Sequence, residues 1–171
     1  MITIVRATIN DAELIVRIGK TSFLESHGMS APKEVIDDYV TLKFNEATFS
    51  DELQDSSNYF YIIYHNQKPV GYSKIIFDFP HPTIPFENVT KLERLYLLEE
   101  FHHLKLGLEL FNYNVKESIK NNQAGIWLFV WTENSQALKF YNKVGFKIIG
   151  KYDFEISKNH FNPNHQMLLT Y

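Results

Sequence analysis

Residues 91–120 have the spacing of a strand, a turn and a helix, an arrangement that can bind an anionic ligand. Residues 91–98 alternate aliphatic and polar side chains and then become apolar, residues 99–103 break that pattern, and residues 104–111 begin a helical one. The first amide N–H groups of a helix lack partners within the helix and point outward, so they can hold a phosphate group. The stretch therefore predicts a site for a phosphate-bearing cofactor.

Two adjacent histidines, His102 and His103, lie in the turn of this stretch and raise the question of a metal site. Adjacent residues do not face the same way on a helix, and the sequence contains neither an H-E-x-x-H motif nor a cysteine. We therefore expect no metal. The lack of cysteine also excludes disulfides, thiolate zinc sites and a cysteine nucleophile.

The hydrophobic pattern of the first half predicts the elements that lead up to this stretch. They are a strand over residues 1–7, helices over residues 11–26 and 48–53, another helix opened by Ser30 and Pro32, and a hairpin of strands over residues 59–64 and 70–79. Asn10 as N-cap and Glu13 three residues later predict a capping box for the first helix. Gly71, inside the second hairpin strand, indicates a bulge or a close approach of two backbones.

The second half of the chain predicts further strands around one helix. Residues 126–131 are typical of a buried strand, a helix begins at Asn134 and ends at Gly145, and strands follow over residues 146–150 and 167–171. Residues 162–164 are predicted to form a polar connection between those last two strands. Because parallel crossovers are expected in the second half only, the fold class is α+β with a mixed sheet, not a regular doubly wound one.

Composition limits the class of protein. A chain of 171 residues with 44% hydrophobic and 22% charged residues is expected to form one domain over residues 1–171. The net charge of -3 gives no support for nucleic-acid binding. No apolar run approaches the roughly 18 residues of a membrane span, and the N-terminal residues lack a signal-peptide pattern. We therefore expect a cytoplasmic protein.

A second motif gives these elements a family resemblance. Residues 133–146 read E-N-S-Q-A-L-K-F-Y-N-K-V-G-F and resemble N-x-x-A-x-x-F-Y-x-x-x-G-F, the signature of the GNAT family, the Gcn5-related N-acetyltransferases. The family's cofactor motif, Q/R-x-x-G-x-G/A, stands here as H-H-L-K-L-G over residues 102–107, with only Gly107 kept. Over nearly the whole chain the sequence is most similar to bacterial spermidine/spermine-type acetyltransferases.

The resemblance implies a GNAT fold, in which a mixed, mostly antiparallel sheet is flanked by helices and splays open between two central parallel strands. Acetyl-CoA would lie as co-substrate in that splay, between residues 92–97 and residues 126–130. The implied cofactor-binding residues are Leu95, Tyr96, Leu97, His102, His103, Leu104, Lys105, Leu106, Gly107, Leu108 and Asn134. Lys105 stands where the family has glycine, and because its Cβ penalises a positive φ, we expect the turn to differ in detail.

Two residues are implied to carry the chemistry. Glu93 would take the proton of the acceptor amine, directly or through water, and Tyr141 would protonate the departing thiolate. Each residue also has a structural interpretation: Glu93 as a solvated residue paired with Arg94 or Lys91, and Tyr141 as a core tyrosine. Asn134 fits both a contact with the pantetheine arm and an N-cap.

The predicted function is transfer of an acetyl group from acetyl-CoA to a primary amine, by direct transfer in a ternary complex, with a polyamine-like small molecule as acceptor. An amino acid, an aminoglycoside or a protein N-terminus is an alternative acceptor, and a non-catalytic CoA-binding regulatory module is an alternative function. Family resemblance also predicts a possible homodimer. Tyr39, Tyr72, His27 and Phe77 fit either an acceptor pocket or core packing.

Overall fold

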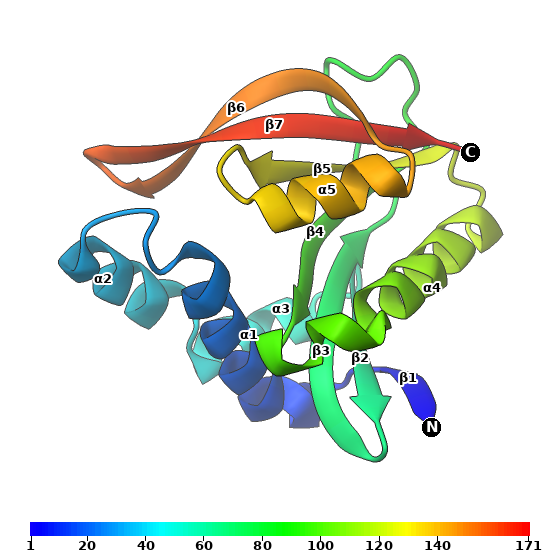
Figure 1. The fold of residues 1–171 in the computed structure, drawn as a ribbon. Helices are drawn as coiled ribbons and strands as arrows, with labels where there is room; N and C mark the ends of the chain where they lie inside the picture. Colours follow the sequence, from blue (N-terminus) through cyan, green and yellow to red (C-terminus); the bar gives the residue numbers. More distant parts are fainter.

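The chain folds into a seven-stranded sheet with helices on both faces (Figure 1). The computed structural model describes residues 1–171. In chain order the elements are β1 (Ile2–Arg6), the 3-10 helix η1 (Ile9–Asp11), α1 (Ala12–His27), α2 (Lys33–Lys43), α3 (Glu46–Gln54), β2 (Asn58–His65), β3 (Lys68–Ile76), β4 (Val89–Leu97), the 3-10 helix η2 (Glu99–Leu104), α4 (Leu106–Lys120), β5 (Gly125–Trp131), α5 (Ser135–Lys143), β6 (Lys147–Ser157) and β7 (His160–Thr170).

The strand order confirms the predicted mixed sheet. The strands lie in the order β1-β2-β3-β4-β5-β7-β6, and all neighbours are antiparallel except β4 and β5, which are parallel. That parallel contact is short, because only residues 89–91 of β4 pair with residues 125–127 of β5. Beyond Lys91 the two strands no longer pair, so the sheet has the predicted splay.

Two apolar clusters fix the helices against the sheet. One cluster includes Leu92, Leu110 and Leu128 and packs α4 and α5 against one face. The other joins residues of α1, α2 and α3, among them Ile15 and Phe49, to Phe60 of β2, and it covers the opposite face of β2 and β3. No helix of the chain combines the length and the apolarity that crossing a membrane requires.

The last two strands are much longer than the sequence pattern predicts. The predicted polar connection at residues 162–164 is wrong, since these residues lie within β7 and pair with residues 152–154 of β6. Pro163 and the polar side chains on either side of it resemble a loop, but the antiparallel pairing continues to Ser157 and His160. The hairpin therefore reaches over α2 (Figure 1), where His160 Nε2 lies 2.9 Å from the Ser30 carbonyl oxygen.

Two local predictions meet different outcomes. The capping box of Asn10 and Glu13 is wrong: a 3-10 turn precedes α1, and the carboxylate of Asp11 accepts the backbone N–H of Thr8 at 2.8 Å. Thr8 and Asp11 have the same three-residue spacing, so the pattern had two possible registers. The prediction for Gly71 is confirmed, because the register shifts beside it and a Cβ there would lie 2.4 Å from the carbonyl oxygen of Tyr96.

Candidate active site

One edge of β4 is left without a strand partner where the sheet splays. The N–H of Leu98 donates to the Val70 carbonyl at 3.0 Å, and Tyr96 pairs with Tyr72, so the main-chain groups of Leu98 and Tyr96 face β3. Main-chain groups alternate along a strand, so those of Leu95 and Leu97 face the opposite edge, where β5 no longer pairs. These groups can bind an extended amide-bearing ligand as an added strand.

His102 ties the end of this edge to α5. Its Nε2 lies 2.8 Å from the backbone carbonyl oxygen of Leu97, and its Nδ1 lies 2.9 Å from Nε2 of the Gln136 side chain. Because a carbonyl only accepts, Nε2 carries the hydrogen and Nδ1 accepts from Gln136. His102 thus occupies the Leu97 carbonyl and positions the open edge, which leaves the N–H of Leu97 and both groups of Leu95 for a ligand.

The turn before α4 takes the shape that a glycine would allow. Lys105 has φ 58 and ψ 17, in the left-handed region, despite its Cβ. Such a conformation costs a side-chain-bearing residue about 1–2 kcal/mol. The replacement of the motif glycine therefore keeps the positive-φ turn, and it leaves the exposed ammonium of Lys105 beside the start of α4.

The first turn of α4 supplies some, but not all, of the anion-binding N–H groups that the motif implies. The amides of Leu108 and Glu109 donate to the Lys105 carbonyl at 3.0 and 3.3 Å, so the amide of Leu108 is already engaged. Those of Leu106 and Gly107 are the helix-start donors that remain. A Cβ at Gly107 would meet only Leu97 Cδ2, at 4.0 Å, so the space beside this glycine is open. The open strand edge, the free amides and this space fit the pantetheine and diphosphate groups of acetyl-CoA.

The side chains of the remaining site residues lie in different environments. The side chains of His103, Leu104 and Lys105 are exposed, and that of Leu106 is buried in the core. Asn134 accepts the N–H of Ala137 at 3.1 Å, which confirms its N-cap interpretation. The structure therefore gives Asn134 the task of starting α5, the helix that carries Tyr141.

Tyr141 lies on α5 against the aromatic rings of Phe140 and Phe146, at 5.3 Å from each. Burial raises the pKa of Tyr141 well above its ordinary value of 10.0, and the nearby phenol of Tyr96, on β4, raises it further. The hydroxyl is therefore protonated at every physiological pH. A buried, protonated phenol next to the splay can donate a hydrogen bond to a negative charge that develops there.

Glu93 lies in a bulge of β4 within a partly buried group of charges. The register of β3 and β4 shifts so that Lys74 pairs with Arg94 and Ile75 with Leu92, which leaves Glu93 as the extra residue. Its carboxylate is ion-paired with Lys74 and lies 3.4 Å from Lys91 Nζ. Lys74 also donates to Oε2 of Glu52, on α3, at 2.8 Å, and Arg94 donates to both oxygens of Glu52, at 2.8 and 3.0 Å.

These contacts determine the basicity of Glu93. Burial alone would raise its pKa, but the charge and hydrogen bond of Lys74, together with Arg94 and Lys91, outweigh burial and lower the pKa below 4.5. Glu93 is thus ionised and weakly basic. Sequence reasoning missed Lys74 and Glu52; the available signal was a lysine inside an otherwise buried strand, because a buried lysine needs a carboxylate partner.

The predicted acceptor-lining residues separate into different environments. Tyr72 is fully buried in the core. His27 and Tyr39 lie together on the α1–α2 side, where the His27 ring stacks between Phe23 at 5.0 Å and Trp131 at 5.5 Å. The Tyr39 ring stacks on Phe23 at 5.1 Å. His27 and Tyr39 therefore remain candidates for the acceptor side, and they bring Trp131 of β5 into the same group.

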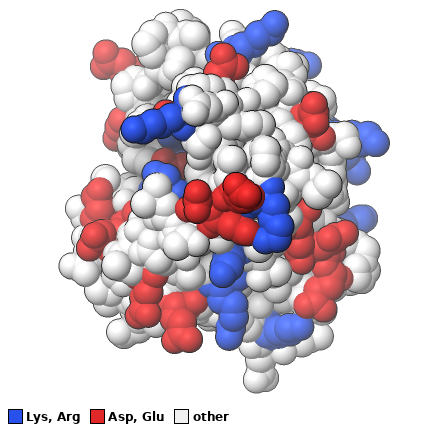
Figure 2. All heavy atoms as spheres, turned by 90° about the vertical axis from the view of Figure 1, so that its left-hand side faces the viewer, with Lys and Arg blue, Asp and Glu red and all other residues white.

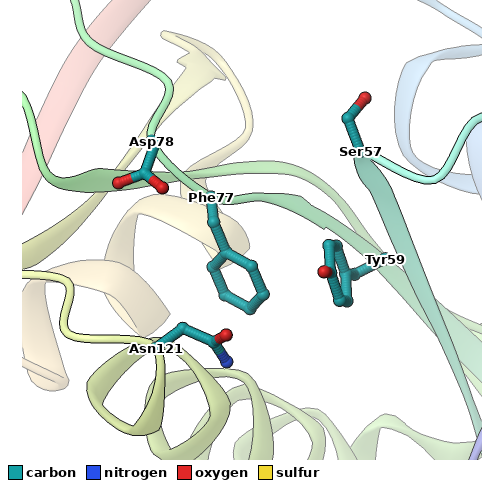
Figure 3. A pocket seen from close by; sticks show the side chains of 5 residues that line it. All are labelled: Ser57, Tyr59, Phe77, Asp78 and Asn121. Atoms are coloured by element: carbon teal, nitrogen blue, oxygen red, sulfur yellow. The ribbon is translucent and has the colours of Figure 1, made fainter.

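Phe77 lies elsewhere, in a pocket where β2 and the end of β3 meet the C-terminal end of α4. That pocket has a volume of about 260 Å³ and is lined by Ser57, Tyr59, Phe77, Asp78 and Asn121. Figure 3 shows the rings of Phe77 and Tyr59 side by side, with Asn121 below them. None of the residues around Glu93 or Tyr141 lines this pocket, so it is separate from the candidate active site.

The surface over α2 and the tip of the β6–β7 hairpin has no single sign of charge. Figure 2 shows acidic and basic side chains interspersed on this face of the molecule. The net charge of -3 is likewise small. Long-range attraction of a highly charged acceptor is therefore not a property of this face.

Comparison with known proteins agrees with the geometry. The acetyltransferase (GNAT) family model matches residues 22–146. An uncharacterized N-acetyltransferase in the pepI 3' region of Lactobacillus delbrueckii subsp. lactis is 25% identical over 84% of this chain and 83% of that protein. A spermidine N(1)-acetyltransferase of Thermoplasma acidophilum is 24% identical over 86% of this chain and 89% of that protein.

Solved structures share the fold over essentially the full chain. The PaiA N-acetyltransferase from Thermoplasma acidophilum, solved in complex with coenzyme A, superposes with a TM-score of 0.80 at 22% identity, covering 100% of this chain and 99% of that one. The ribosomal-protein-S18-alanine N-acetyltransferase from Escherichia coli gives a TM-score of 0.72 at 17% identity, covering 99% and 94%. The match of the family model, supported by this fold, shows that the chain belongs to the acetyltransferase (GNAT) family.

Proposed function

We propose that this acetyl-CoA-dependent N-acetyltransferase transfers the acetyl group directly to a primary amine while both substrates are bound. Acetyl-CoA supplies an activated thioester. A bond forms between the amine nitrogen and the acetyl carbon, the carbon–sulfur bond breaks, and one proton passes in net from nitrogen to sulfur. The chain has no cysteine to carry the acetyl group. The observation that carries the proposal is the open edge of β4, with the buried phenol of Tyr141 beside it.

Tyr141 acts on the leaving group. Its raised pKa keeps the phenol protonated, but it also makes full transfer to a thiolate of pKa about 8.5 uphill. The phenol therefore stabilises the departing sulfur mainly by donating a hydrogen bond. Removal of one preorganised hydrogen-bond donor of this kind typically lowers kcat about 10²–10³-fold.

Glu93 acts on the acceptor. A carboxylate whose pKa is lowered by Lys74 is a poor final base for an ammonium of pKa about 10.4. It can still accept a hydrogen bond from the amine, or from a water molecule that carries the proton to solvent. Glu93 is therefore proposed to orient the amine and its departing proton.

The acceptor predicted from the sequence is a polyamine-like small molecule. The name of the spermidine N(1)-acetyltransferase among the relatives supports this choice. The charges around the bulge add no support, because Glu52 and Glu93 are both already ion-paired with cations of the chain. The proposal is therefore an N-acetyltransferase for a primary amine, with polyamines as the first candidates to assay.

The test is release of the CoA thiol from acetyl-CoA in the presence of an amine panel, for the wild type and for Tyr141→Phe. We expect kcat to fall about 10²-fold or more in Tyr141→Phe with acetyl-CoA binding unchanged. Tyr64→Phe, on β2, is the matched control and keeps wild-type turnover. Acetyl-CoA binding without turnover on any amine would instead favour a CoA-binding regulatory module, and unchanged turnover in Tyr141→Phe would remove that residue from the mechanism.

A further inference from the structure

A row of three amide side chains lies on one face of β7. The end of the row at Asn162 and Asn164 is turned toward α1 and α2, whereas Gln166 lies against the loop between β3 and β4, where its Oε1 accepts the hydroxyl of Thr83 at 2.8 Å. Asn162, Asn164 and Gln166 alternate along the strand and therefore share one face. Paired residues of neighbouring strands share that face too: Trp131 of β5 is paired with Asn164, and Phe154 of β6 with Asn162. Because Trp131 stacks on His27, and Phe154 lies 6.3 Å from Tyr39, this face looks onto the acceptor side.

The three amide side chains are buried, yet each has a polar atom without a hydrogen-bond partner. Asn162, Asn164 and Gln166 are only 3%, 8% and 1% exposed. The Nδ2 of Asn162, the Oδ1 of Asn164 and the Nε2 of Gln166 have no hydrogen-bond partner. Buried polar atoms are almost always paired in folded proteins, so a row of unpaired ones needs a partner that the chain does not supply.

The orientation of Asn162 is determined by its neighbour His160. Nε2 of His160 lies 2.9 Å from the Ser30 carbonyl oxygen and 3.1 Å from Oδ1 of Asn162. Since a carbonyl only accepts, Nε2 carries the hydrogen, and Asn162 must direct its oxygen toward His160. Its NH2 group is then the free one, so this position offers hydrogen-bond donors.

A second element presents an unpaired polar atom at the same place. Ser30, in the loop between α1 and α2, is joined to Asn162 through His160, and its buried hydroxyl also lacks a partner. The hydroxyl can donate or accept. The α1–α2 loop and β7 therefore form one polar group with both donors and acceptors, bounded by the rings of Trp131, Tyr152 and Phe154.

No carboxylate of the neighbouring strands shares this face. Asp153 and Glu155 of β6 alternate with Tyr152 and Phe154 and so lie on the opposite face. The carboxylates at the β4 bulge, Glu52 and Glu93, are ion-paired. An acceptor with several ammonium groups offers only donors, and it would leave the NH2 group of Asn162 unsatisfied.

We propose that the acceptor amine belongs to a molecule that also contains an amide group, such as a short peptide or a peptide amide, and that Asn162, Asn164 and Ser30 bind that group. An amide has a carbonyl oxygen for the NH2 group of Asn162 and an N–H for Oδ1 of Asn164. Its planar apolar flanks pack on the aromatic rings beside the row. This inference rests on the proposed transferase function, and for the same site it replaces the polyamine-like acceptor with an amide-bearing amine as the substrate class.

The test compares a dipeptide amide with a diamine of equal chain length, at equal concentrations of free amine, for the wild type and Asn162→Asp. Aspartate has the shape of asparagine and keeps an oxygen for His160, but it has no NH2 donor and adds a charge suited to a cation. We expect the wild type to favour the dipeptide amide at least tenfold in kcat/KM. In Asn162→Asp that kcat/KM falls at least tenfold, mainly through KM, and the preference shifts toward the diamine.

The charge-matched control is Asn159→Asp, at an exposed position in the turn between β6 and β7, which keeps the wild-type preference within twofold. Equal or better use of the diamine by the wild type would overturn the inference, as would an unchanged preference in a folded Asn162→Asp. The melting temperature in the presence of CoA gives a second measurement. Stabilisation by the dipeptide amide without turnover would support the site and overturn the transferase proposal, whereas neither stabilisation nor turnover would overturn both.

Discussion

The carboxylate of Glu93, which is half-buried, and the ammonium of Lys74, which is buried, form an ion pair at the bulge of β4. Lys74 has a side chain only 7% exposed, and it binds Glu52 as well as Glu93. Arg94 completes the group through its two contacts with Glu52. The bulge makes this possible, because it brings consecutive residues of β4 toward the same neighbours. The basicity of the proposed acceptor-orienting residue therefore depends on a lysine of the adjacent strand.

Replacing Lys74 by Met should destabilise the fold strongly. Removing one partner of a fully buried ion pair costs about 3–5 kcal/mol. Here Lys74 binds two carboxylates, but Glu52 keeps Arg94 and Glu93 keeps Lys91, so we expect a loss near the lower end of that range. Urea unfolding followed by circular dichroism measures the loss. Lys68→Met is the control, since Lys68 forms an exposed pair with Glu100 of the kind that contributes about 0–1 kcal/mol. Equal losses in the two variants would show that the buried pair has no special role.

The pH dependence of turnover should follow the deprotonation of the acceptor ammonium and not the ionisation of Glu93. Transfer of a proton from an ammonium of pKa about 10.4 to an ordinary carboxylate is uphill by about 8 kcal/mol, whereas release to water at pH 7 costs about 4–5 kcal/mol. The lowered pKa of Glu93 makes the direct route worse. We expect kcat/KM to rise about tenfold per pH unit below the amine pKa in both the wild type and Glu93→Gln, with lower values in the variant. A pH-dependent limb that is lost in Glu93→Gln would instead identify Glu93 as the final base.

Sequence reasoning predicted the elements with strong apolar periodicity and missed what depends on pairing across the sheet. The splay follows from the family signature at residues 134–146, and the short contact of β4 and β5 confirms it. The charges around Glu93 were not predictable, since Lys74 and Glu52 are distant in sequence and meet only through the bulge. The polar side chains of residues 162–164 resemble a loop and so predict a connection, but strand pairing across the sheet determines their conformation.

His27 should make the fold less stable as the pH falls below neutrality. Burial lowers its pKa from 6.5 to about 4, so between these values the unfolded chain binds a proton that the folded chain does not. Stability is therefore lost on acidification, and His27 contributes a loss of about 2 kcal/mol between pH 7 and pH 5. In His27→Phe, which keeps a ring between Phe23 and Trp131, the free energy of unfolding should vary less with pH. The exposed His103→Phe should keep the wild-type dependence, and an identical profile in His27→Phe would contradict this assignment.

Gly107→Ala should separate fold stability from cofactor binding. The added Cβ meets only Leu97 Cδ2, at 4.0 Å, and alanine is favoured over glycine in a helix by up to about 1 kcal/mol. The variant should therefore unfold at the same or a slightly higher denaturant concentration. If the open space beside Gly107 is where the diphosphate group approaches the amides, the same Cβ should weaken acetyl-CoA binding at least tenfold by isothermal titration calorimetry. Unchanged affinity would place the diphosphate elsewhere.

His102 offers the sharpest test of how the open edge of β4 is positioned. It donates to the Leu97 carbonyl at 2.8 Å and accepts from Gln136 at 2.9 Å, so it joins β4 to the start of α5. A glutamine at this position, which the family motif favours, can both donate and accept.

We expect His102→Gln to keep the affinity for acetyl-CoA within about threefold. We expect His102→Ala to weaken it about tenfold, since one hydrogen bond to a backbone carbonyl contributes about 0.5–1.5 kcal/mol and its loss also frees the edge to move. Gln136→Ala removes only the second contact and should fall between the two. Equal affinities in all three variants would mean that Leu97 is held in place by β3 alone.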